Sequence, residues 1–302
     1  MKLVLKYITL TFLAVLMLNG CKESYVTYSD AEYVMFADTL KVYPVQQDVE
    51  YFNVPVVSTV KRNYDRTFAV EIIDKGSNAI ENLHYRLKSN TITIKAGQTR
   101  ADVQVHGYYD NIEDTDSLGF ELQLVMNDKL EMGMYGKQTK VVLMKSCPFD
   151  INDFTGYCVL TSMFLYNYSV TGSYQRLVYT EKHPTEENKI ICRNWIADGY
   201  DVTMTFNAED PMTPLVTMDK DQVASDEGSF FGTSYGDDKL LVTNSSLYDS
   251  VFYPCGRYLY IWTEMYVYDL STPIGTVGHF YNIMEWVSDE EAKRLIREGM
   301  SL

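Results

Sequence analysis

Basic residues are scarce in this sequence: 26 Lys and Arg stand against 41 Asp and Glu, which gives a formal net charge of −15. Binding to nucleic acid requires clustered Lys and Arg that neutralise phosphates, so this composition argues against a nucleic-acid partner. Histidine is rarer still, with 4 residues, and no two of them have the close spacing of a zinc-binding pair. The cysteines form no C-x-x-C pair, which removes a zinc ribbon and a thioredoxin-type redox centre.

Signatures of nucleotide chemistry are also missing, since the chain contains neither a P-loop nor a dinucleotide-binding fingerprint. One hydrolase-like pattern is present: residues 232–236 read Gly-Thr-Ser-Tyr-Gly, and Asp237 or Asp249 and then His279 follow Ser234. A catalytic elbow needs a buried strand before the serine and a helix after it. Here a polar segment precedes the serine and a strand-like segment follows it. We therefore interpret the pattern as a turn and expect no enzyme activity.

The first 20 residues have the composition of a secretory signal. Lys2 and Lys6 precede a nearly unbroken apolar run over residues 8–18, and the segment holds no acid. The run is too short to cross a bilayer, which takes about 20 apolar residues. It ends in Leu-Asn-Gly followed by Cys21, which resembles the bacterial lipobox. The alternatives are a secreted protein cut elsewhere and an uncleaved anchor.

The lipobox resemblance implies that residues 1–20 are removed and that Cys21 carries acyl chains such as palmitate, with residues 21–29 as a tether. Several acyl chains anchor a protein firmly, because each buried methylene contributes about 0.8 kcal/mol. No Asp follows Cys21, which points to the outer membrane, and the pair Lys22-Glu23 is similar to the surface-export signal of Bacteroidetes lipoproteins. We expect a lipid-anchored outer-membrane protein on the cell surface; the periplasmic face stays an alternative.

Residues 30–146 have the rhythm of a β-sandwich. Apolar and polar residues alternate in stretches such as 68–72 and 101–105, which turns one face of a strand inward. Strands are expected at residues 33–36, 40–45, 51–60, 66–73, 91–95, 101–106, 119–125 and 139–144. Short strands separated by turns at this density predict an all-β, antiparallel sandwich.

Several segments of this half, in order, resemble the Calx-β family of Ig-like sandwiches. A turn over residues 79–85 ends in Tyr, the strand and turn 91–99 read Thr-Ile-Thr-Ile-Lys-Ala-Gly-Gln-Thr, and an alternating strand follows at 101–105. An acidic turn at 110–116 then precedes Phe-Glu-Leu-Gln-Leu at 120–124. The resemblance covers residues 35–127. Similar sandwiches open many lipoproteins of polysaccharide-utilisation systems.

The same resemblance implies calcium as a candidate cofactor, because some Calx-β domains bind it through acids at one end of the sandwich. The acidic turn offers Asp110, Glu113, Asp114 and Asp116 as ligands. Calcium takes six to eight oxygen ligands, and several carboxylates in one loop can supply part of that set. The spacing is not that of an EF-hand, and a solvated acidic loop is the alternative.

Residues 147–302 contain a second set of strands, expected at 157–164, 175–179, 189–195, 201–206, 215–219, 240–244, 257–268 and 276–286. They resemble the small lipocalin-like barrels at the C-termini of the same surface lipoproteins. Closure into a barrel removes free strand edges. The chain ends in a predicted helix that Ser288 and Glu291 begin as a capping box and Gly299 ends, and we expect it to plug or flank the barrel.

Four cysteines remain beyond Cys21, namely Cys147, Cys158, Cys192 and Cys255. Export makes disulfides available to them. Cys147 lies at the boundary between the two halves and has Cys158 or Cys255 as partner candidates. Four unpaired thiols are the alternative, and the spacing alone leaves the pairing open.

Tyrosine is abundant, with 25 residues, and one expected strand carries aromatic residues at a single parity. These residues are Tyr258, Tyr260, Trp262, Tyr266 and Tyr268. Such a face most often packs into a core; the alternative is a surface that lines a ligand or stacks on sugar. We therefore hypothesise a non-catalytic surface lipoprotein, an accessory glycan-binding or scaffold subunit beside outer-membrane polysaccharide-uptake proteins. An adhesion or structural surface protein is the first alternative, and a hydrolase is the second.

Overall fold

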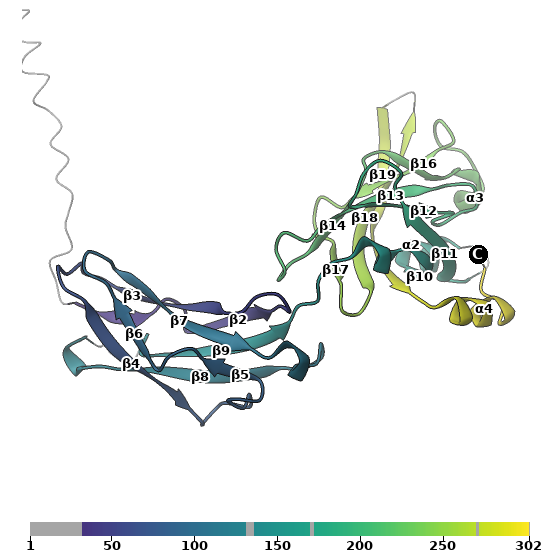
Figure 1. Ribbon diagram of the computed structural model, residues 1–302. Helices are drawn as coiled ribbons and strands as arrows, with labels where there is room; N and C mark the ends of the chain where they lie inside the picture. The colour runs from purple at the N-terminus through teal and green to yellow at the C-terminus, as the bar shows by residue number, and fades with distance from the viewer. Residues whose placement is uncertain (1–31, 131–135, 170–171, 270–271, 302) are drawn as a thin grey trace, which may run out of the picture.

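Two separate hydrophobic cores organise the computed structural model, which describes residues 32–130, 136–169, 172–269 and 272–301 (Figure 1). One core gathers buried residues between Val34 and Leu143, and the other gathers residues between Phe154 and Trp286. The fold is all-β: a sandwich is followed by a barrel and a short C-terminal helix, which confirms the predicted fold class. In the described ranges, no helix has both the length and the apolar character needed to span a membrane.

The sandwich consists of one sheet in the order β1-β3-β7-β5 and a second in the order β2-β9-β8-β4-β6. Its strands are β1 (Val34–Phe36), β2 (Leu40–Val45), β3 (Phe52–Ser58), β4 (Arg66–Ile73), β5 (Tyr85–Leu87), β6 (Thr91–Ile94), β7 (Arg100–Gly107), β8 (Leu118–Val125) and β9 (Gln138–Lys145). Short 3₁₀ turns are η1 (Tyr109–Asn111), η2 (Asp128–Leu130) and η3 (Ile151–Phe154). In the core, the ring of Tyr85 stacks on Phe120 with centroids 3.6 Å apart.

One pairing in the sandwich departs from the antiparallel prediction, because β2 runs parallel to β9. A parallel pair cannot be joined by a hairpin and needs a long connection. Here that connection contains most of the sandwich, from β3 to β8. The second strand of the sandwich thus pairs beside the last one, and both run toward the linker.

The second half forms one sheet that closes on itself. Its elements are β10 (Gly156–Ser162), α2 (Met163–Tyr168), β11 (Gln175–Lys182), β12 (Lys189–Arg193), β13 (Val202–Asn207), β14 (Leu215–Met218), β15 (Gln222–Ser225), α3 (Gly228–Phe231), β16 (Leu240–Asn244), β17 (Val251–Tyr253), β18 (Tyr258–Asp269), β19 (Thr272–Trp286) and α4 (Asp289–Arg297). Strand β19 pairs with β10 on one edge and with β18 on the other, which closes the barrel. The long β18 pairs with β17 near its start and with β16 farther along.

Aromatic side chains fill the end of the barrel near the linker. Phe149 and Phe252 pack with Phe154 and Phe206, with ring centroids between 4.9 and 5.8 Å apart. Trp286 joins them, and its Nε1 donates a hydrogen bond of 2.8 Å to Thr180 Oγ1. The interior of the closed ring is therefore filled with side chains.

The predicted C-terminal helix is present as α4. Ser288 Oγ accepts a hydrogen bond of 3.2 Å from the amide of Glu291, as the capping pattern requires. The helix buries Ala292 against Val159 and Leu177, which lie on the outside of the barrel. Of the two expected roles, α4 therefore flanks the barrel and does not plug it.

The strand expected at residues 157–164 ends earlier than predicted. Ser162 Oγ accepts a hydrogen bond of 3.4 Å from the amide of Leu165 and caps α2. A serine cap of this kind favours the start of a helix. Phe164 and Leu165 are buried in the barrel core from that helix.

A disulfide joins Cys147 to Cys255, so the structure selects one of the two partners that the sequence left open. It ties the linker after β9 to the turn between β17 and β18. Cys158 and Cys192 are free thiols inside the barrel, and burial raises the pKa of both well above that of an exposed thiol.

Candidate functional site

The aromatic side chains at alternate positions near the start of β18 point out of the barrel. Its neighbours Leu259 and Ile261 are fully buried in the barrel core, and side chains alternate along a strand. Tyr258, Tyr260 and Trp262 therefore lie on the outer face, where they are half-buried. Core packing is the wrong interpretation for these three residues, because the aliphatic side chains that alternate with them fill the interior instead.

Aromatic residues from neighbouring segments extend this face into a continuous patch, here called the aromatic strip. Its members are Tyr248, Tyr253, Tyr258, Tyr260, Trp262 and Tyr281. Trp262 and Tyr281 sit opposite each other in the pairing of β18 with β19, with ring centroids 5.0 Å apart. Tyr248 contacts Trp262 at 4.3 Å.

The strip continues toward the start of β18. Tyr281 stacks on Tyr260 at 5.4 Å, Tyr260 contacts Tyr253 at 5.6 Å, and Tyr253 stacks on Tyr258 at 4.7 Å. A strand rises about 3.4 Å per residue, so Tyr258 and Trp262 stand roughly 13 Å apart along β18. The strip is therefore longer than a single ring-shaped ligand.

Two of the sequence candidates lie outside the strip. Tyr266 is buried and its hydroxyl donates a hydrogen bond to Asp221, while Tyr268 contacts the Tyr266 ring edge-on at 5.2 Å. The pairing of β18 with β19 is irregular between Met265 and Tyr266, and the strict alternation ends there. Burial, together with the Asp221 carboxylate, raises the pKa of Tyr266. This pair is a structural contact of the barrel wall.

Two phenol groups of the strip, those of Tyr258 and Tyr281, have a pKa above that of an exposed phenol. Partial burial, with the neighbouring phenol of Tyr260, raises the pKa of Tyr281 to about 12. Burial also raises the pKa of Tyr258, with contributions from Tyr260 and Tyr253 and from the Asp114 carboxylate. Each hydroxyl can thus both donate and accept a hydrogen bond at the edge of an apolar ring.

Polar side chains border the Trp262 end of the strip. Glu264 and His279 pair across β18 and β19, two residues along the strands from the Trp262–Tyr281 pair. His279 Nδ1 lies 3.0 Å from Ser245 Oγ, and Thr276 Oγ1 donates a hydrogen bond of 2.9 Å to Glu264 Oε1. Rings flanked by hydroxyl, imidazole and carboxylate groups form a surface that can take both the apolar and the polar faces of one ligand.

Ser234, the serine of the hydrolase-like pattern, follows α3 and not a strand. The buried Glu227 carboxylate accepts hydrogen bonds from the amides of Tyr235 and Gly236, which holds this segment as a turn. His279 has its hydrogen bond with Ser245. The structure thus gives the pattern a local role in the loop.

The other end of the strip opens into a pocket of about 210 Å³ between the two bodies. Tyr253, Tyr258 and Met212 line it from the barrel, and Asp114 and Met144 line it from the sandwich and its last strand. The Cys147–Cys255 disulfide forms part of the same wall. In Figure 1, β17 lies on the side of the barrel nearest the linker.

The structure does not bring the four calcium candidates together. No group of three or more His, Cys, Asp and Glu side chains in the described ranges is arranged to hold a metal ion. Asp116 Oδ2 instead accepts a hydrogen bond of 2.9 Å from the amide of Glu113, which shapes the turn. Asp110 and Asp114 are exposed. This donor set does not fit calcium, and no metal enters the account of the site.

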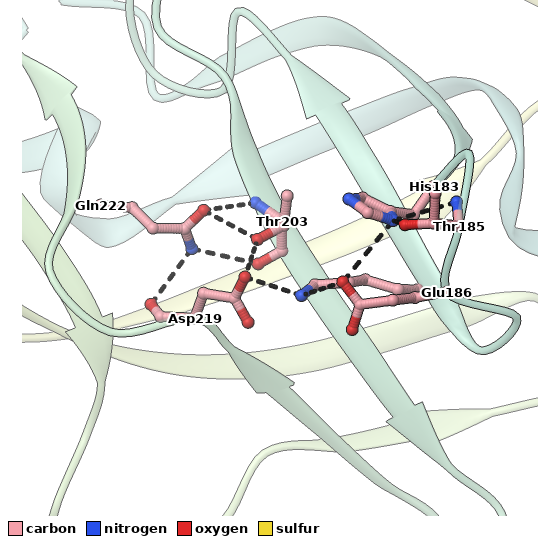
Figure 2. Close-up of polar contacts among 7 residues, drawn as sticks. His183, Thr185, Glu186, Thr203, Asp219 and Gln222 are labelled. Atoms are coloured by element: carbon pink, nitrogen blue, oxygen red, sulfur yellow. Dashed lines mark hydrogen bonds and ion pairs between the residues drawn. The ribbon is translucent and has the colours of Figure 1, made fainter.

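A second polar cluster, drawn in Figure 2, lies on the barrel wall, and Lys189 forms ion pairs within it. Its ammonium group lies 3.0 Å from Glu186 and 2.8 Å from Asp219, and Thr203 Oγ1 donates to Asp219 at 2.7 Å. Partial burial alone would raise the pKa of Asp219, but the bonds from Lys189 and Thr203 lower it overall. Every charged group drawn there already has a partner, so we interpret the cluster as a support for the wall.

The fold and the strip define the protein as a two-body, all-β protein with an exposed aromatic surface. Residues 134–298, more than half of the chain, match a family described as a domain of unknown function, DUF4984, and the chain belongs to this family. A search of curated proteins finds no match.

Three solved structures are similar to this chain. A structural-genomics protein of unknown function from Bacteroides ovatus is 11% identical, with coverage of 85% of this chain and 94% of that chain and a TM-score of 0.34. An auxiliary nutrient binding protein from Bacteroides thetaiotaomicron is 14% identical, with coverage of 82% and 91% and a TM-score of 0.32. The apo form of a Calx CBD1 domain is 13% identical, with coverage of 38% and 98% and a TM-score of 0.32.

Proposed function

We propose that this protein binds a neutral glycan on the aromatic strip, without chemical conversion of it, as an accessory subunit beside outer-membrane polysaccharide-uptake proteins. The observation that carries the proposal is the run of six contacting aromatic rings on the outer face of β18 and its neighbours. These rings do not belong to the barrel core, because the alternate side chains of β18 fill the interior.

The chemistry of the strip suits a sugar. The ring of a sugar has apolar C–H faces and a rim of hydroxyls, and a site that takes it needs flat apolar surface beside hydrogen-bonding groups. Trp262 and Tyr281 give the flat surface, while Ser245, His279 and Glu264 border it. The net charge of −15 repels acidic glycans, which is why we propose a neutral one.

Binding without catalysis is supported by the partners of the polar groups beside the strip. His279 is bonded to Ser245, and Glu264 accepts a hydrogen bond from Thr276. Glycoside cleavage uses two carboxyl groups that face one bond across a sugar ring. Next to Trp262, Glu264 faces His279 across the strands. We therefore propose that these groups orient a bound glycan and do not cleave it.

A panel of polysaccharides cast into native gels tests the proposal. We expect the chain from residue 22 onward to be retarded by at least one neutral member among amylose, β-glucan, mannan, galactan and xylan, and not by polygalacturonate. Tyr166→Ala is the matched control, because Tyr166 is 71% exposed on α2 and its ring contacts Tyr174, which is not part of the strip. No retardation by any neutral member would contradict glycan binding and favour the adhesion alternative, in which the strip meets another protein.

We also propose that Cys21, which lies outside the described residues, carries the lipid that holds the protein at the outer membrane. A Cys21→Ser variant is expected to lose incorporation of labelled palmitate and to move from the membrane to the soluble fraction. Protease treatment of whole cells then tests surface exposure. If Cys21→Ser stayed in the membrane fraction and still incorporated the label, the proposed anchor would be contradicted. The proposal for the aromatic strip does not depend on this result.

A further inference from the structure

The two ends of the aromatic strip differ. At one end Tyr248 is 51% exposed on the loop after β16, and nothing in the described ranges stands beyond it in the chain of ring contacts. At the other end Tyr253 and Tyr258 line the pocket between the sandwich and the barrel. A ligand that extends along the strip from Trp262 toward Tyr258 therefore runs into a wall.

That wall is made by the linker and is fixed in place. Met144 and Lys145 end β9, and Ser146 and Cys147 follow them in the pocket lining. Cys147 is covalently joined to Cys255 in the turn between β17 and β18, two residues beyond Tyr253. Tyr109 of the sandwich donates a hydrogen bond of 3.2 Å to the Cys147 sulfur. The disulfide and this hydrogen bond join the wall to the end of the strip.

We propose that this pocket is a terminal subsite that takes the last sugar ring of a neutral glycan, so that the protein recognises chain ends. The inference rests on the proposed function and adds the form of glycan that the strip selects. A surface open at both ends binds the interior of a polymer, whereas a surface closed at one end by the Cys147–Cys255 wall accepts a chain only by its end.

The size and lining of the pocket fit a single ring. Its volume of about 210 Å³ lies below the roughly 300–1,000 Å³ of sites for drug-sized ligands. Met212 and Met144 give an apolar surface, and the Tyr258 hydroxyl and the Asp114 carboxylate give hydrogen-bonding groups for hydroxyls. Asp114 also disfavours an acidic ring such as a uronic acid, because two carboxylates would repel each other.

Counting the protein molecules bound per glycan chain tests the inference directly. Each neutral panel glycan is used as a short oligosaccharide and as its parent polymer, in calorimetric titrations of the mature chain. End recognition predicts the same number of protein molecules per chain for both forms, and an affinity per gram that falls as the chain lengthens. Stoichiometry that rises in proportion to chain length would overturn end recognition and leave glycan binding on the strip intact.

A variant that fills the pocket gives a second readout. Met212 is half-buried in a loop, so Met212→Trp is expected to fold and to reduce the affinity for the short oligosaccharides at least about tenfold. Ile296→Trp, at a position 38% exposed on α4, is the control for an added indole. Unchanged affinity of a Met212→Trp protein with wild-type circular dichroism would overturn the terminal subsite. Failure of the wild type to bind any panel glycan would overturn both proposals.

Discussion

Trp262→Ala is expected to weaken glycan binding about thirtyfold. A sugar ring that covers roughly 80 Å² of the indole face removes that area from water, which at about 25 cal/mol per Å² amounts to about 2 kcal/mol. A loss of 1.4 kcal/mol corresponds to a factor of ten in affinity. Trp262 contacts both Tyr248 and Tyr281, so its removal also separates Tyr248 from the rest of the strip.

The measurement is a calorimetric titration with the oligosaccharide form of the panel glycan that retards the protein. Trp262→Phe retains part of the flat surface and should recover part of the affinity, and Tyr166→Ala should bind like the wild type. Thermal unfolding of each variant separates lost contact from lost structure. Equal affinity of Trp262→Ala and the wild type would remove the strip from the binding site.

Removal of the disulfide has the second large expected effect. The cross-link closes a loop with a sequence separation of 108 residues that contains most of the barrel. A native disulfide typically contributes about 2–4 kcal/mol, more for long loops, because it restricts the unfolded chain. We expect the Cys147→Ser/Cys255→Ser variant to unfold roughly 5–15 °C below the wild type.

Differential scanning calorimetry with and without a thiol reductant provides the control. The wild type should fall to the midpoint of the double variant when reductant is added, and the double variant should not respond. Cys158 and Cys192 are free in the structure and do not contribute to this difference. Two results together would contradict the cross-link. The unfolding midpoint of the wild type would not change with reductant, and its mass under non-reducing conditions would be two hydrogens above that of the disulfide-bonded chain.

Long alternating segments made most of the strands predictable. Residues 66–73 were expected as a strand and form β4 with the same bounds, because apolar residues at one parity have a single way to face a core. Very short strands such as β5 and β17 were not predicted, because three residues are too few to show an alternating pattern. Both are set by pairing with a longer neighbour, β7 and β18 respectively.

The candidate site was only partly predictable. The sequence showed the aromatic parity of β18, and it also contained the information that this parity faces outward, in the aliphatic residues Leu259 and Ile261 between the rings. Tyr281 and Tyr253 could not be assigned to the strip, because their place depends on strand register. The pairing of Cys147 and the position of Asp114 beside Tyr258 likewise depend on contacts far apart in the chain.

A crystal structure of the protein with a bound neutral oligosaccharide tests the central claim most directly. The account predicts sugar rings lying face-on over Trp262 and Tyr281, with hydroxyls within hydrogen-bond distance of the Ser245, His279 and Glu264 side chains. An oligosaccharide bound at a place that touches neither β18 nor β19 would contradict it. So would an aromatic strip that a second protein molecule covers in solution while sugar is bound elsewhere.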